Sequence, residues 1–66
     1  MTQQEYLKVV KEKLGVMWDE LAEQSSISPR ALKTYRMPET SKDYRSMPRL
    51  AKAAIDRLLQ ERGIKV

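Results

Sequence analysis

Two basic side chains, Arg30 and Lys33, follow a strong signal for the start of a helix. Ser28 is a favourable N-cap, and Pro29 suits the first helical turn, where its missing N–H is no loss. Side chains at such a start project outward, and the planar guanidinium of Arg30 can bind O6 and N7 of guanine together. If this helix is the second helix of a helix-turn-helix, the geometry of that motif places Arg30 and Lys33 against base edges and Pro29 in close packing beside them. The alternative is that Arg30 touches only phosphate or solvent.

Positive charge is concentrated in the middle of the chain. Residues 28–52 hold seven basic and two acidic side chains, a net charge of +5, whereas residues 1–27 carry −2. Such a segment favours a polyanionic partner, most commonly nucleic acid, over a merely solvated basic loop. We expect phosphate contacts from Ser28, Arg36, Lys42, Tyr44, Arg45 and Arg49. Ser28 is also explained by capping alone, Tyr44 by anchoring its loop to the core, and each basic residue by a solvated charge.

The sequence gives little support for an enzymatic activity. Asp19 and Glu23 share a helix face at i and i+4, but the chain has no histidine and no cysteine to complete a metal or acid–base site. No serine has a base partner, and no glycine-rich loop could hold a nucleotide. We therefore expect a solvated acidic face at Asp19 and Glu23, and a protein that is not an enzyme and has no cofactor or metal.

Helix signals divide the chain into four segments. Thr2 and Glu5 have the spacing of a capping box, Gly15 can end the first helix, and the Ser-Pro signal recurs at Ser46 and Pro48. The apolar spacing predicts an all-α, compact four-helix domain with helices over about residues 3–14, 17–24, 29–36 and 48–62. Gly63 should cap the last helix, with Ile64 folding back on Leu59.

Length and hydropathy set further limits. With 66 residues the chain is one small domain, residues 1–66, without room for a large enclosed active site. The longest apolar stretch, residues 14–18, is far shorter than the roughly 20 residues that a membrane helix needs, and no signal segment is present. We expect a soluble, cytoplasmic protein with no membrane partner.

A known motif matches the centre of the chain. Residues 21–28 resemble the Leu-Ala-x-x-x-Gly-hydrophobic-Ser core of phage Cro and repressor helix-turn-helix proteins, with Ser26 in place of the usual turn glycine. The resemblance implies that Ala22 lies where the two helices touch. It also implies that Ile27 and Leu32 are buried and that Tyr35 packs in the core rather than stacking on a base. Trp18 lies at a phosphate-binding position of the motif, where it could also pack against the first helix or a partner subunit.

A closer resemblance extends beyond this motif. The shared residues are Ala22-Glu23, Ile27-Ser28, Arg30, Tyr35, Tyr44-Arg45 and Pro48. Over about residues 15–60 they are similar to one branch of the phage anti-CRISPR-associated regulators, small dimeric repressors of anti-CRISPR operons. Asp19 and Glu20 depart from that branch, which has basic residues there. The resemblance implies a transcriptional regulator that binds an inverted repeat in double-stranded DNA, bacterial or phage, as a homodimer.

Two other functions remain open. A helix-turn-helix fold can serve as a protein-binding inhibitor of a host factor, which Asp19 and Glu20 beside Trp18 favour slightly, or as an architectural DNA-binding accessory protein. For the homodimer we expect contacts near the carboxyl end. The reason is that this end carries more apolar residues than one face of a short helix can bury, namely Leu58, Leu59, Ile64 and Val66.

Overall fold

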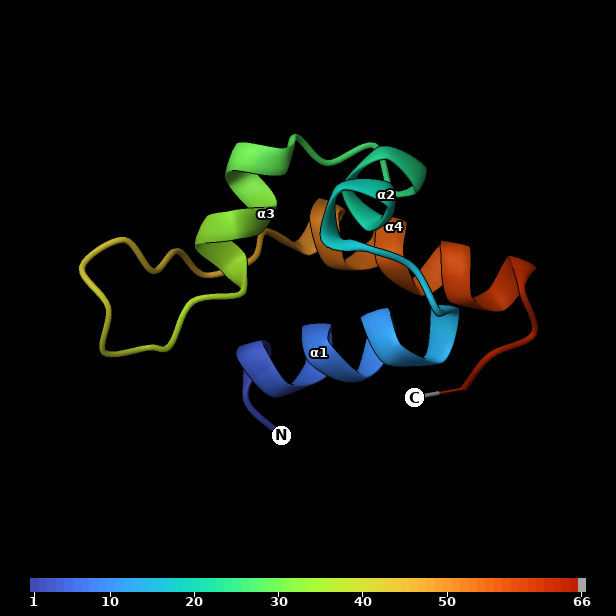
Figure 1. Ribbon diagram of the computed structural model, residues 1–66, viewed down its shortest axis with the longest axis horizontal. Helices are drawn as coiled ribbons and strands as arrows, with labels where there is room; N and C mark the ends of the chain where they lie inside the picture. Colours follow the sequence, from blue (N-terminus) through green and yellow to red (C-terminus); the bar gives the residue numbers. More distant parts are fainter. Residues whose placement is uncertain (66) are drawn as a thin grey trace.

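Four α-helices form the whole regular structure of residues 1–65, the part of the chain that the computed structural model describes (Figure 1). The helices are α1 (Gln3–Leu14), α2 (Trp18–Gln24), α3 (Pro29–Tyr35) and α4 (Arg49–Glu61). The prediction of an all-α four-helix fold is confirmed, and every helix boundary lies within one residue of its expected place. No helix among these residues has the length and apolar character needed to cross a bilayer.

Local capping explains where α1 and α4 end. The Thr2 hydroxyl accepts a hydrogen bond from the Glu5 N–H at 3.1 Å and so satisfies a free donor at the start of α1. Gly15, with φ of 67°, ends that helix in the left-handed conformation. After α4, Gly63 has φ of 68° and the Ile64 N–H donates to the Leu59 carbonyl at 2.9 Å. Both predicted glycine caps are therefore confirmed.

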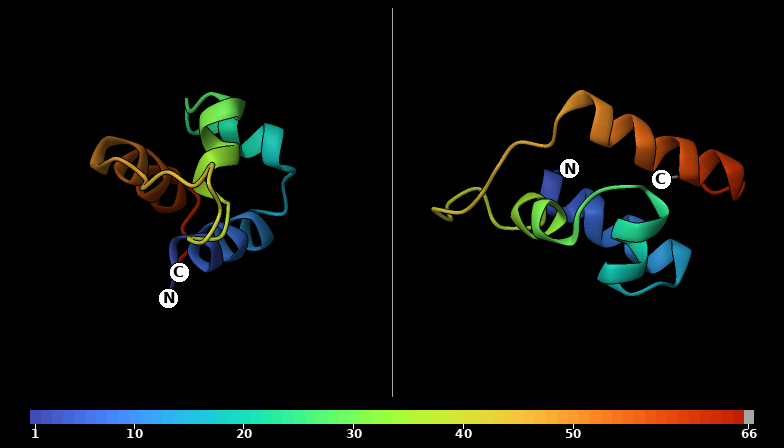
Figure 2. Two further views of the ribbon diagram at one scale, coloured as in Figure 1. Left: turned by 90° about the vertical axis from the view of Figure 1, so that its left-hand side faces the viewer. Right: turned by 90° about the horizontal axis from the view of Figure 1, so that it is seen from above.

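The long helices α1 and α4 lie side by side, and the α2–α3 pair covers them (Figures 1 and 2). Each helix contributes apolar side chains to one core, whose buried members are Leu7, Val10, Leu21, Ala22, Leu32, Ile55, Leu58 and Leu59. Because α2 and α3 contain only seven residues each, their stability depends on this packing more than on intrinsic helix propensity.

The core removes two of the four predicted dimer contacts at the carboxyl end, Leu58 and Leu59. Leu58 and Leu59 are only 7% and 5% exposed because they pack inside their own chain, and Ile64 is half-buried against the same cluster. The prediction considered one face of one helix, whereas α1 and the α2–α3 pair together bury two sides of α4. Leu58 and Leu59 are thus unavailable to a second chain. Val66, the fourth predicted contact, lies outside the described residues.

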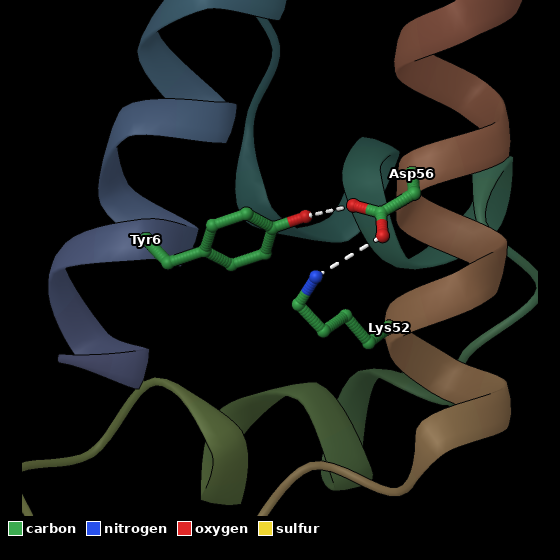
Figure 3. Close-up of polar contacts among 3 residues, drawn as sticks. All are labelled: Tyr6, Lys52 and Asp56. Atoms are coloured by element: carbon green, nitrogen blue, oxygen red, sulfur yellow. Dashed lines mark hydrogen bonds and ion pairs between the residues drawn. The ribbon is translucent and has the colours of Figure 1, made fainter. Parts of the chain in front are cut away.

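A polar link joins α1 to α4 beside the core (Figure 3). The Tyr6 hydroxyl donates to Oδ1 of Asp56 at 2.5 Å, and Nζ of Lys52 lies 3.1 Å from Oδ2 of the same carboxylate. Burial, followed by this contact with Asp56, raises the pKa of Tyr6. The hydrogen bond from Tyr6, aided by Lys52, lowers the pKa of Asp56. The link therefore favours a neutral phenol and an ionised carboxylate.

Gln3 fastens the long α3–α4 loop, residues 36–48, to the start of α1. Its Nε2 donates to the carbonyls of Tyr35 and Arg45, each at 2.9 Å. Its Oε1 accepts from the Met47 N–H at 2.8 Å and from the Tyr44 hydroxyl at 3.4 Å. One side chain on α1 thus contacts both ends of a loop that begins more than thirty residues later.

Candidate nucleic-acid interface

The connection between α2 and α3 is a tight turn, residues 25–28. Ser26 has φ of 59°, the one positive φ outside glycine among residues 1–65. The buried Ser25 hydroxyl donates to the Leu21 carbonyl at 2.6 Å, and the Ile27 N–H donates to the Ala22 carbonyl at 2.9 Å. The position where the resemblance calls for glycine thus adopts the left-handed conformation that favours glycine, at a cost that serine must bear.

Packing around this turn agrees with most of the expected core positions. Ala22 and Leu32 are 0% and 1% exposed, as the motif implies. Tyr35 and Ile27 are only half-buried, although both pack against the core cluster. The core packing expected of Tyr35 is therefore confirmed, whereas the expected burial of Ile27 is only partial, because one side of Ile27 remains open to a groove between α3 and α4.

The start of α3 presents its predicted residues to solvent. Ser28 caps the helix, its Oγ accepting from the Ala31 N–H at 3.1 Å, which confirms the capping interpretation. Pro29, Arg30 and Lys33 are exposed. They line one groove together with Arg36 and with Trp18 and Asp19 from the beginning of α2. The structure thus brings together the three proposed base-reading residues and one of the proposed phosphate contacts.

Trp18 connects this groove to α1. The Arg36 guanidinium lies 4.9 Å from the centroid of the indole ring, and the Lys11 ammonium lies 5.6 Å from it. Lys8 and Lys11 line a second groove that also contains Trp18, Arg36 and one acidic residue, Glu12. The basic surface therefore continues from α3 onto α1. The net charge of each sequence segment did not identify Lys8 and Lys11 as part of a basic surface, because both lie in a segment whose net charge is negative.

The basic residues of the groove are free of carboxylate partners. Among residues 1–65 the ion pair between Lys52 and Asp56 is the sole one, so Arg30, Lys33 and Arg36 keep their charges available for an external anion. The same part of the chain holds no group of three or more acidic, histidine or cysteine side chains that could bind a metal ion. Cations without a carboxylate partner suit contacts to phosphate or to base edges.

The other predicted phosphate contacts lie on a different part of the molecule. Lys42 and Arg45 are exposed on the loop that leaves the carboxyl end of α3, and Arg49 is exposed at the first turn of α4 (Figure 1). Tyr44 directs its hydroxyl to Gln3, which supports its role as a loop anchor rather than a phosphate contact. The loop residues therefore do not join Arg30 and Lys33 in one groove.

Acidic residues border the basic groove at the start of α2. Glu20 turns back on its own helix, where its Oε1 accepts from the Met17 N–H at 3.3 Å. Asp19 instead lines the groove beside Arg30 and Lys33. A carboxylate at this place weakens the attraction of the groove for phosphate.

Two short helices, a four-residue turn and an exposed basic helix start form the candidate interface. Its cations come from α1, from α3 and from Arg36 directly after α3, and Lys11 and Arg36 both lie near the indole ring of Trp18. Comparisons of the chain with models of protein families, with curated proteins and with solved structures found no match.

Proposed function

We propose that this chain is a sequence-specific DNA-binding transcriptional regulator, a phage-type repressor acting on DNA in the cytoplasm. In this proposal α2, the turn and α3 form a helix-turn-helix, and two copies bind an inverted repeat. The observation that carries it is the exposed, unpaired pair of cations Arg30 and Lys33 at the amino-terminal turns of α3. The left-handed Ser26 and the buried Ala22 and Leu32 support the motif.

On the duplex, the start of α3 would contact bases, and the cations near Trp18 would contact phosphates. A major groove about 12 Å wide admits an α-helix, and α3 would enter it amino end first. Pro29 has no backbone N–H to leave unpaired there, and the fork of Arg30 matches the acceptors of guanine. Arg36 and Lys11, both close to the ring of Trp18, would bind the flanking phosphates and fix the register of the helix.

Selection from random duplex DNA, followed by affinity measurements on Arg30→Ala, tests this proposal. The variant should lose about 1–3 kcal/mol of discrimination at one base pair per half-site while nearly keeping its affinity for random DNA. Arg62→Ala is the matched control, because Arg62 is equally charged and exposed but donates to Gln24 on another face. Equal losses for consensus and random DNA would assign Arg30 to phosphate. Failure to recover any bound duplex would refute the proposal.

A protein-binding inhibitor is the second candidate, and Asp19 is the observation that favours it. This carboxylate lines the groove that would have to face phosphate. If the groove binds DNA, Asp19→Asn should strengthen binding by about two- to fivefold, because one repulsive charge is removed. If the groove binds a protein with basic side chains, the same substitution should weaken that complex. Direct titration of the variant with duplex DNA separates the two functions.

A further inference from the structure

An apolar surface lies on the opposite side of α3 from the DNA-reading residues. Leu50, in the first turn of α4, is 84% exposed, the largest exposure of a hydrophobic side chain among residues 1–65. It stands at the edge of a groove between the α2–α3 turn, α3 and α4, whose apolar lining consists of Leu50 itself and of Ile27, Ala31, Tyr35, Pro48, Ala51 and Ala54. We call Leu50 and this lining the α3–α4 surface.

This surface has no use in the proposed DNA contact. The groove contains no charged residue, and its other lining residues are the three serines of the turn. A polyanion gains nothing from such a lining, and an exposed leucine beside half-buried Ile27 and Tyr35 loses free energy in water. The surface is instead suited to an apolar partner.

We infer that the partner is a second copy of this chain, which meets the first through the α3–α4 surface. The surface carries both a protruding leucine and an adjacent apolar groove, so a two-fold rotation places Leu50 of each copy in the groove of the other. Such reciprocity is what an isologous dimer contact requires. The inference rests on the proposed function for its purpose, but the α3–α4 surface itself is independent of DNA.

The available area predicts a weak dimer. A second groove shares Leu50 and Ala54 with the first and extends along α4 to Gln60, so the two grooves together involve fourteen residues. At about 35 Å² for each interface residue, every copy would bury about 500 Å², or about 1,000 Å² in total, the lower limit for a specific interface. The chain exposes 4805 Å², so this contact uses about a tenth of its surface.

The charges on the α3–α4 surface allow two copies to meet there, and the groove that contains Arg30 and Lys33 stays free in such a dimer. The extended surface includes one acidic and one basic side chain, Asp56 and Arg57, so two copies bring no excess of like charge together. Ala31 and Tyr35 face this groove, whereas Arg30 and Lys33 face the groove on the α2 side. Two copies would thus hold both α3 helices near the two-fold axis with their reading residues free, and an inverted repeat would stabilise the weak dimer.

Sedimentation equilibrium from micromolar to submillimolar concentration tests the inference. Leu50→Gln should raise the dimer dissociation constant about tenfold for each leucine lost, and so about a hundredfold for the pair. Met17→Gln is the matched control, because Met17 is 65% exposed and lines neither groove. Parent-like association of Leu50→Gln, or a parent chain that stays monomeric throughout, would overturn the inference.

Cross-linking and half-site binding give independent readouts. The chain has no cysteine, so Leu50→Cys and Met17→Cys each introduce a single thiol. A bifunctional maleimide should link two copies of Leu50→Cys and leave Met17→Cys largely unlinked; equal yields would overturn the inference. On DNA, Leu50→Gln should bind a single half-site like the parent and lose cooperative binding to the inverted repeat. A parent that dimerises through Leu50 but binds no DNA would refute the proposed function alone.

Discussion

Replacing Gln3 by alanine should destabilise the fold far more than its place in the first turn of a helix suggests. The substitution removes three hydrogen bonds of 2.8 to 2.9 Å and a longer one from the Tyr44 hydroxyl. A neutral hydrogen bond contributes about 1 kcal/mol net, and partial access of water to these groups lowers the total loss to about 2 kcal/mol. A domain of this size has a total stability of about 3–10 kcal/mol, so the loss is readily measured.

Urea denaturation followed by circular dichroism measures this loss, and amide exchange locates it. The Met47 amide, whose acceptor is Gln3 Oε1, should exchange about thirtyfold faster in Gln3→Ala, the equivalent of 2 kcal/mol. Gln3→Glu is a sharper variant. It keeps an acceptor for the Met47 N–H but places a carboxylate oxygen against the Tyr35 and Arg45 carbonyls, so it should destabilise at least as much as alanine.

Gln4→Ala is the matched control, because Gln4 is the same residue type in the same helical turn and is exposed. Its effect should stay within about 0.5 kcal/mol. If the two alanine variants unfold at the same urea concentration, or if the Met47 amide exchanges at the parent rate, Gln3 does not hold the loop.

Three further predictions follow from other parts of the structure. Ser26→Gly should stabilise the fold by about 0.5 kcal/mol, since relief of the left-handed strain exceeds the added entropy of the unfolded chain, whereas Ser26→Val should lower the urea midpoint. Tyr6→Phe should cost about 1 kcal/mol at pH 7. Contact with Tyr6 lowers the pKa of Asp56, so the difference in unfolding free energy between the parent and Tyr6→Phe should be largest above about pH 4 and shrink as the pH falls through the depressed pKa. A difference that grows in acid would contradict the assignment. For DNA binding, Lys11→Gln and Arg36→Gln should each reduce the slope of log affinity against log salt by about 0.9, and Lys13→Gln, exposed elsewhere on α1, should leave it unchanged.

Signals confined to a few neighbouring residues predicted the helices well. Thr2 and Gly15 mark the two ends of α1, Ser28 and Pro29 start α3, and Gly63 follows the end of α4. Each acts through contacts within one turn of the chain. Such caps depend on side-chain type and backbone conformation alone, so a single sequence contains the necessary information.

Residues that act across the fold could not be found in this way. Gln3 is a polar residue at a helix start, and no local pattern indicates that its partners lie in the α3–α4 loop. Leu58 and Leu59 belong to the core because α1 and the α2–α3 pair enclose two sides of α4, which depends on how the helices are arranged. A prediction made one helix at a time must misjudge which apolar residues remain exposed.

The arrangement of the helices also gives α3 two different surfaces, each suited to one of the two proposed partners. Although α3 has only seven residues, the buried Leu32 separates two surfaces of opposite character. On the α2 side, Arg30 and Lys33 meet Trp18 and Arg36 in a groove rich in unpaired cations. On the α4 side, the groove next to Leu50 is free of charge. Because binding a polyanion and covering apolar surface require opposite chemistry, this separation would let α3 make both proposed contacts, with DNA and with a second copy, at the same time.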